Sequence, residues 1–168
     1  LPGSVQGQIT PQPINQPCTA CEATSVHAAD LDGDGSTDVL STSQFDDKVA
    51  WYENNGGSYG EQQVISTATD KPQTVTAADL DGDGDLDVIS GSKGDNKLVW
   101  YENQMGDGGA DSDGFGPAQV ISTSYGSVVS VAAGKIDSDD KADVVIGTSD
   151  GVYWFSSQIG DSGDDFSA

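Results

Sequence analysis

Basic residues are scarce in this chain. It holds 6 Lys and Arg residues against 28 Asp and Glu residues, so its formal net charge is −22 over 168 residues. Nucleic acids and anionic membrane surfaces are bound by clusters of Lys and Arg, and the scarcity of these residues argues against both partners. The sequence also lacks an apolar run of about 18 residues, so we expect no membrane-spanning segment.

Methionine and apolar residues are scarce as well. The only methionine is Met105, so we expect that residue 1 follows a removed leader or that the chain was excised from a longer one. Apolar residues make up 35% of the sequence, and low apolar content with high net charge is a signature of disorder. Here, however, the acidic residues recur in register with short Val, Ile, Trp and Tyr runs, which indicates folded repeats.

Three repeat units account for most of the sequence. Each has an acidic block, and the blocks read AADLDGDGSTDVL (28–40), AADLDGDGDLDVI (77–89) and AGKIDSDDKADVV (133–145). An aromatic block follows each one, as KVAWYEN (48–54), KLVWYEN (97–103) and GVYWFS (151–156). A further block occurs in the first two units, as YGEQQVIST (59–67) and FGPAQVIST (115–123).

The blocks predict four short strands in a complete unit, because they are rich in β-branched and aromatic residues and lack a 3.6-residue period. Consecutive apolar residues in the second and third strands favour sheets covered on both faces, as in stacked propeller blades. We expect an all-β fold of three four-stranded antiparallel blades over residues 24–72, 73–126 and 127–168, preceded by a segment over 1–23. Three tryptophans recur in register and are expected in the core between blades: Trp51, Trp100 and Trp154.

The loop between the first and second strands carries the most specific chemistry. Three aspartates at alternate positions precede a glycine turn and a fourth aspartate. In the first two units they are Asp30, Asp32, Asp34 and Asp38, and Asp79, Asp81, Asp83 and Asp87. Ca²⁺ takes six to eight oxygen ligands, and converging carboxylates supply them. Without a cation, each pair of carboxylates at about 4 Å would repel by roughly 1 kcal/mol even in water. We predict two calcium sites here.

Two other interpretations account for some features of these loops. An EF-hand needs a bidentate Glu at loop position 12 and flanking helices, but Ser41 and Ser90 stand there and strands follow, so this interpretation is rejected. Solvated aspartate–glycine turns without an ion are the simpler alternative. Two copies at the same place relative to the strands favour the metal site.

The third loop departs from the other two. Lys135 stands at the first ligand position, and the remaining acidic positions are Asp137, Asp139 and Asp143. A third calcium ion would use these carboxylates. Alternatively, the Lys135 ammonium would pair with them in place of the ion.

The AADLDGDGxxDV loop, the WYEN strand and the Tyr59-Gly60 and Phe115-Gly116 steps resemble the FG-GAP/VCBS repeat family over residues 24–168. The resemblance implies β-propeller blades with calcium in the loop between the first two strands, held by the aspartates named above. It also implies an extracellular adhesion, lectin or scaffold module without catalytic activity of its own. Propellers of this family have about seven blades, whereas this sequence supplies three.

The two ends of the chain suggest a strand that is out of phase. Phe166 aligns with Tyr59 and Phe115, so the third unit stops where its fourth strand would begin. Near the start, VQGQIT (5–10) resembles the AQVIST segment, and Val5 and Ile9 are its apolar positions. We expect this strand to complete the third blade, either within the chain or in a neighbouring copy. Head-to-tail donation would give a ring or a filament.

Cys18 and Cys21 form a C-x-x-C pair in a Pro-rich connector. A redox pair would need a βαβ setting, and a zinc site would need two more soft ligands. A local disulfide in a secreted chain is the expectation.

The sequence favours a non-enzymatic, extracellular, calcium-stabilised repeat protein that acts in self-assembly or adhesion through strand donation, with copies of itself as partners. Two other functions stay open. One is a carbohydrate-binding, lectin-like propeller that recognises glycans. The other is a fragment of a larger propeller linked to an enzyme.

Overall fold

The computed structural model describes residues 11–14, 22–105, 114–139, 141–159 and 166–167. This part of the chain contains strands and no helices, arranged as three antiparallel four-stranded sheets. The first sheet holds β1 (Ala23–Ala29), β2 (Asp38–Ser43), β3 (Lys48–Tyr52) and β4 (Gln63–Ser66). The second holds β5 (Pro72–Ala78), β6 (Asp87–Ser92), β7 (Leu98–Tyr101) and β8 (Gln119–Ser122). The third holds β9 (Val128–Gly134), β10 (Asp143–Thr148), β11 (Val152–Ser157) and β12 (Phe166–Ser167).

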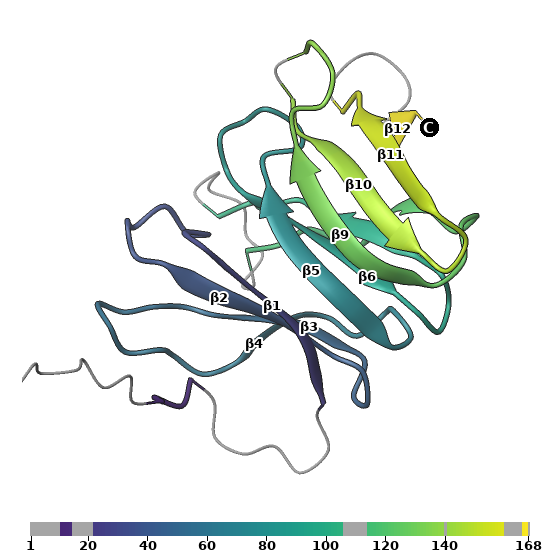
Figure 1. The fold of residues 1–168 in the computed structure, drawn as a ribbon. Coiled ribbons are helices and arrows are strands. Elements are labelled where there is room, and N and C mark those ends of the chain that lie inside the picture. The colour runs from purple at the N-terminus through teal and green to yellow at the C-terminus, as the bar shows by residue number, and fades with distance from the viewer. Residues whose placement is uncertain (1–10, 15–21, 106–113, 140, 160–165, 168) are drawn as a thin grey trace, which may run out of the picture.

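The expected all-β fold of three propeller-type sheets is confirmed. Within a sheet the strands lie in chain order, each antiparallel to the next. Figure 1 shows the inner strands β1, β5 and β9 side by side, with the three sheets fanning outward from them. In the described part of the chain, the strands of each unit lie on the apolar blocks of the sequence, because these blocks and the turns that separate them recur from unit to unit.

The core consists of two apolar clusters, one in each gap between sheets. In the first gap, Leu40, Val49 and Trp51 of the first sheet pack against side chains of β6 and β7 in the second. In the second gap, the equivalent residues Ile89, Leu98 and Trp100 pack against β10 and β11. Burying these side chains contributes roughly 1.5–3 kcal/mol each. Among the described strands, the middle sheet therefore has a neighbouring sheet on both faces, and each outer sheet has one on a single face.

Hydrogen bonds repeat across both gaps with the same geometry. Asn103 Nδ2 donates to the carbonyl oxygen of Leu31 at 2.8 Å across the first gap, and Ser157 Oγ donates to that of Leu80 at 2.8 Å across the second. Nearer the inner strands, the backbone amide of Val75 donates to Ser25 Oγ, and that of Val131 donates to Thr74 Oγ1. One stacking arrangement is thus used twice.

Trp154 departs from the sequence expectation. It is 46% exposed, whereas Trp51 and Trp100 are 4% and 3% exposed. The reason is positional: this face of β11 points away from the second sheet, and no further sheet among the described residues covers it.

The outer edge of the third sheet also differs from the other two. β12 pairs with β11 at Ser156 and Ser157. This pairing corresponds to the isolated bridges Asn54–Tyr59 and Asn103–Phe115 of the other units, rather than to β4 and β8. The described residues hold no counterpart of those two strands in the third sheet.

Two sequence predictions fall on residues outside the described part and stay predictions. One is the strand with Val5 and Ile9, and the other is the disulfide between Cys18 and Cys21. Within the described ranges, no helix has the length and apolar character needed to cross a membrane.

Candidate metal centres in the acidic loops

Each of the three acidic loops gathers three carboxylates. In every group, one ligand oxygen from each residue lies within 4.8 Å of the others. The groups are Asp30, Asp32 and Asp38; Asp79, Asp81 and Asp87; and Asp137, Asp139 and Asp143. The loops join β1 to β2, β5 to β6 and β9 to β10, and the last aspartate of each group is the first residue of the second strand.

The last aspartate of each group is fully buried and fastens the loop to the sheet. Asp38 accepts hydrogen bonds from the backbone amides of Leu31 (2.9 Å) and Asn54 (2.8 Å). Asp87 accepts the equivalent bonds from Leu80 and Asn103, both at 2.9 Å. Asp143 repeats the pattern with amides at the start of its loop and the end of β11. Because the amides come from the loop and from the third strand, one carboxylate holds three chain segments together.

Glycine provides the turn that lets the other carboxylates converge. Gly33, Gly35, Gly82 and Gly84 have φ between 73° and 103°, the left-handed region that side chains disfavour. In this turn the carboxylate of Asp30 accepts the amide of Gly35 at 3.0 Å. The third loop has Ser138 where the others have Gly33 and Gly82, and its residue does not adopt a positive φ.

The electrostatics of the first two loops disfavour the ionised form of three of their carboxylates when no cation is bound. Burial raises the pKa of Asp32 and Asp81, and neighbouring aspartates raise both further. Burial likewise raises the pKa of Asp87 to about 7, although the two backbone amides that it accepts oppose the shift. A bound cation would offset the repulsion and the desolvation together.

The donor chemistry of the first two loops fits calcium. Every ligand atom that they offer is a hard carboxylate oxygen, which Ca²⁺ prefers over softer ligands. Asp30 Oδ1 is buried without a hydrogen-bond partner, which is the state expected of an atom that would contact an ion. Asp34 and Asp83 lie outside the close groups, and each accepts a backbone amide two residues ahead.

The third loop gathers a different subset of positions. Its group uses Asp139, the position of Asp34 and Asp83, and has Lys135 at the place of Asp30 and Asp79. Ser156 Oγ donates to Asp137 at 2.9 Å. The backbone amide of Asp139 and, to a smaller extent, this hydroxyl lower the Asp137 pKa, so the protein itself stabilises part of the third group.

A second pair of acidic turns, which the repeat pattern does not mark as a site, lies between the second and third strands of the first two sheets. In the β2–β3 and β6–β7 turns, Lys48 pairs with Asp46 at 2.9 Å and Lys97 with Asp95 at 2.7 Å. Burial opposes ionisation of Asp46 and Asp95, but the partner hydroxyls and lysines lower the pKa of both. The repeated spacing of Ser, Asp and Lys was the available signal. Because each carboxylate already has a lysine, these turns are structural rather than metal-binding.

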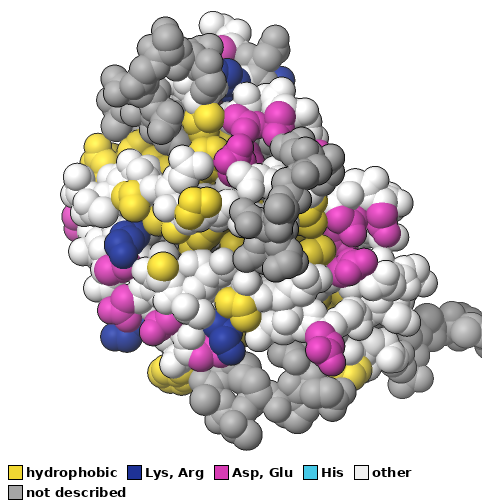
Figure 2. Space-filling view, turned by 180° about the vertical axis from the view of Figure 1, so that it is seen from behind, with side chains coloured by type: hydrophobic (Ala, Val, Ile, Leu, Met, Phe, Trp, Pro, Cys, Tyr) yellow, Lys and Arg dark blue, Asp and Glu magenta, His cyan; other side chains and the backbone are white. Residues whose placement is uncertain are grey.

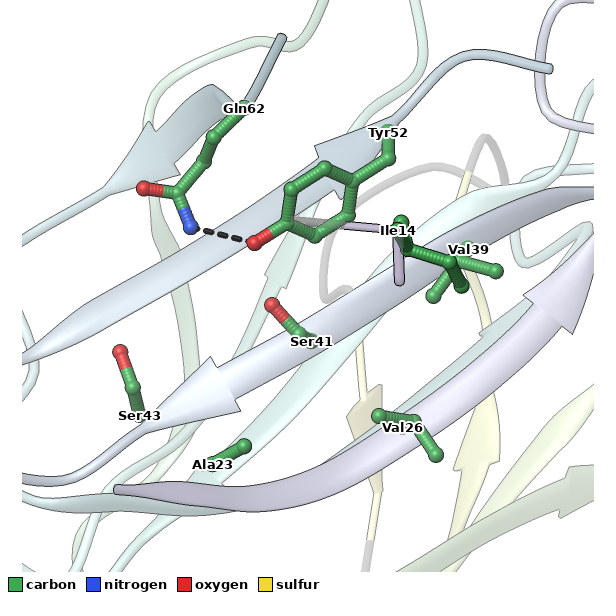
Figure 3. A pocket seen from close by; sticks show the side chains of 8 residues that line it. All are labelled: Ile14, Ala23, Val26, Val39, Ser41, Ser43, Tyr52 and Gln62. Atoms are coloured by element: carbon green, nitrogen blue, oxygen red, sulfur yellow. Dashed lines mark hydrogen bonds between the residues drawn. The ribbon is translucent and has the colours of Figure 1, made fainter. Parts of the chain in front are cut away.

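The outer face of the first sheet carries a pocket of about 180 Å³. Side chains from β1, β2 and β3 line it together with connector residue Ile14, and Gln62 Nε2 donates to the Tyr52 hydroxyl at 2.6 Å (Figure 3). The pocket is mainly apolar and has no aspartate in its lining. Figure 2 shows the acidic side chains in several separate groups on one face of the molecule.

Stacked four-stranded antiparallel sheets with an acidic loop after each inner strand define a β-propeller repeat protein. The chain belongs to the FG-GAP-like repeat family, whose model matches residues 30–90 and 79–146. No curated protein matches the sequence.

Among solved structures, the chain is similar to a lectin of Agrocybe aegerita that specifically recognises non-reducing terminal N-acetylglucosamine. The TM-score is 0.55 at 16% identity, and the match covers 89% of this chain and 37% of the lectin chain. At this identity the likeness concerns the fold. Because the match covers 37% of the lectin chain, this chain spans a little over a third of that lectin's length.

The raised pKa of Asp87 predicts how the calcium-free protein responds to pH. The folded-state value of about 7 lies above the usual 3.8, so the folded chain holds a proton that the unfolded chain has lost. Between about pH 4 and 7, this group therefore makes stability fall as pH rises. Urea unfolding in chelator should show wild type losing stability relative to Asp87→Asn, which does not ionise. A wild type that gains relative to this variant would contradict the assignment.

Proposed function

We propose that this chain is a non-catalytic, extracellular repeat protein that binds calcium in its acidic loops and assembles with copies of itself. The observation that carries the proposal is an open strand edge in the third sheet. Assembly is the function, and the ions stabilise the subunit that assembles.

The open edge lies along the first half of β11. In the first two sheets the third strand pairs with neighbours on both sides. β11 pairs with β10 over Val152–Phe155, but β12 reaches only Ser156 and Ser157. Among the described residues, the outer edge of Val152–Trp154 therefore has no strand partner, and such an edge is a template for strand addition. The proposed partner strand is residues 5–10 of a neighbouring copy.

The acidic loops support both the proposed calcium binding and the proposed extracellular location. The carboxylate groups of the first two loops are the proposed sites of two ions, and the third group is the proposed site of a third. Millimolar calcium outside cells would keep sites of moderate affinity occupied, which supports an extracellular location.

Removing the donated strand tests the proposal. In calcium, the full chain should form rings or filaments, and a chain without residues 1–10 should remain soluble and much smaller. Electron microscopy and sedimentation velocity would measure both. As a matched pair, Ile9→Asp should weaken assembly, whereas Gln8→Asp should not, because adjacent residues of a strand face opposite sides. Particles of unchanged size after the truncation would exclude strand donation.

Carbohydrate binding is the second candidate, and its support is the shared fold with the Agrocybe aegerita lectin. A glycan array probed with monomeric protein separates the candidates. Specific glycan binding by monomers that do not assemble would favour the lectin-like function over self-assembly.

A further inference from the structure

The two sheet-to-sheet interfaces inside the chain are copies of one interface. In each, one sheet contributes a face formed by its acidic loop, its second strand and its third strand, which we call the protruding face. In the first gap this face consists of Leu31, Leu40, Val49 and Trp51, and in the second of Leu80, Ile89, Leu98 and Trp100. The next sheet receives it with the opposite type of face. The three-sheet stack therefore ends in one protruding face and one receiving face.

The protruding face at the end of the stack belongs to the third sheet, and we name it the plug. By alignment of the repeats it consists of Ile136, Val145, Val152 and Trp154. Val152 is 76% exposed, whereas its equivalents Val49 and Leu98 are completely buried. The plug thus keeps the apolar character of the internal faces without their cover.

The receiving face belongs to the first sheet, and we name it the socket. It consists of Val26, Val39, Ser41 and Tyr52, all of which line the pocket in Figure 3. In the second sheet the equivalent positions Val75, Val88 and Tyr101 hold the protruding face of the first sheet. Val26 is 68% exposed against 4% for Val75. The pocket is the place that a neighbouring tryptophan and aliphatic side chains fill inside the chain.

The polar contacts of the internal interface also have counterparts at the two ends. Asn103 Nδ2 donates both to Leu86 O of its own sheet (3.1 Å) and to Leu31 O of the preceding sheet (2.8 Å). In the socket, Asn54 Nδ2 donates to the own-sheet carbonyl of Thr37 at 2.9 Å. The preceding-sheet carbonyl that would complete the pattern is that of Ile136 in the plug.

A second polar pair follows the same logic along the inner strands. The hydroxyls of Ser25 and Thr74 each accept the backbone amide of a valine in the next sheet. Ser130 of the third sheet stands at their position, and Val26 of the first sheet stands at the position of those valines. Plug and socket therefore carry the same kinds of apolar residues and hydrogen-bonding groups that join the sheets inside the chain.

We propose that the plug of one copy docks into the socket of a second copy, head to tail, so that the stack of sheets continues across the boundary between subunits. This inference rests on the proposed self-assembly and names the surfaces that carry it. Ile14 lies in front of Val39 in Figure 3, so docking requires this connector residue to move aside. Because the two surfaces differ, the contact is heterologous and gives a ring or a filament.

Three matched substitutions test the docking. Val152→Glu places a charge on the plug, and Val26→Glu places one on the socket. Val120→Glu is the control, because Val120 is 57% exposed on β8 of the middle sheet and belongs to neither end face. All three side chains are exposed, so circular dichroism should show unchanged folding. Sedimentation velocity in calcium should show self-association at least about tenfold weaker for the first two variants and unchanged for the control.

Mixing the two end variants is the decisive step. The Val26→Glu chain keeps a working plug and the Val152→Glu chain keeps a working socket, so an equimolar mixture should form a 1:1 dimer that grows no further. If wild type assembles but the end variants assemble equally well, or their mixture yields no dimer, the docking is wrong while self-assembly stands. If wild type remains monomeric at all concentrations, the proposed function fails, and the docking fails with it.

Discussion

Chelating calcium should lower the melting temperature of the protein by on the order of 10 °C. A ligand at 10–100 times its dissociation constant stabilises the folded state by about 1.4–2.7 kcal/mol per site. Two occupied sites would thus contribute about 3–5 kcal/mol, a large part of the 5–15 kcal/mol of a typical domain. For a chain of this length, each kcal/mol corresponds to about 2–4 °C. Differential scanning calorimetry with calcium and with chelator measures the difference.

Single-site variants show how much each loop contributes to the calcium-dependent rise in melting temperature. Asp30→Ala and Asp79→Ala should each remove roughly half of the calcium-dependent increment, because each carboxylate belongs to a separate group. Glu61→Gln is the control, since Glu61 is an exposed acid outside the loops. A melting temperature that is the same with calcium and with chelator would refute the metal assignment.

Asp87→Ala should destabilise the protein by about 3–5 kcal/mol, and most of the loss should persist in chelator. The buried carboxylate accepts the amides of Leu80 and Asn103. Truncation leaves both donors without an acceptor, at about 1–3 kcal/mol each, and it also removes an ion ligand. Urea denaturation with and without calcium measures the two parts.

Asp79→Ala provides the comparison for this variant. Asp79 is half-buried and accepts one local amide, from Gly82, so its loss should lower stability in calcium and change it little in chelator. Equal behaviour of the two variants in chelator would show that Asp87 is not the fastening point of the loop.

Much of the fold could be predicted because the repeat displays it three times. Each acidic block is followed by an apolar strand at constant spacing, so the strands and the loop between the first two could be placed by comparing units. The position of Asp30 and Asp32 near Asp38 follows from the alternating aspartates and the glycine turn. These are local features, and local sequence determines them.

The contacts between repeat units could not be predicted from the sequence. The hydrogen bonds from Asn103 to Leu31 and from Ser157 to Leu80 join residues far apart in the chain, and no local spacing encodes how one sheet lies on the next. The double role of Asp38 and Asp87 was missed for a related reason. Their amide partners at the ends of β3 and β7 are set by strand pairing across the sheet.

The exposure of Trp154 shows how a repeat can mislead. Its alignment with Trp51 and Trp100 implies burial, but burial depends on a following sheet as well as on the residue itself. A residue at the end of an array keeps the side chain of an internal position without its cover. The plug is such an end face, because Trp154 is aromatic like its internal equivalents but exposed.

The central claim is that the first two acidic loops bind calcium. Counting bound ions by native mass spectrometry tests it most directly. In volatile buffer that contains submillimolar calcium acetate, the intact chain should carry at least two calcium ions. Asp30→Ala and Asp79→Ala should each retain one fewer, and Glu61→Gln should retain the wild-type number. A wild-type chain that carries no calcium, or loop variants with the same ion count as wild type, would contradict calcium binding in these loops.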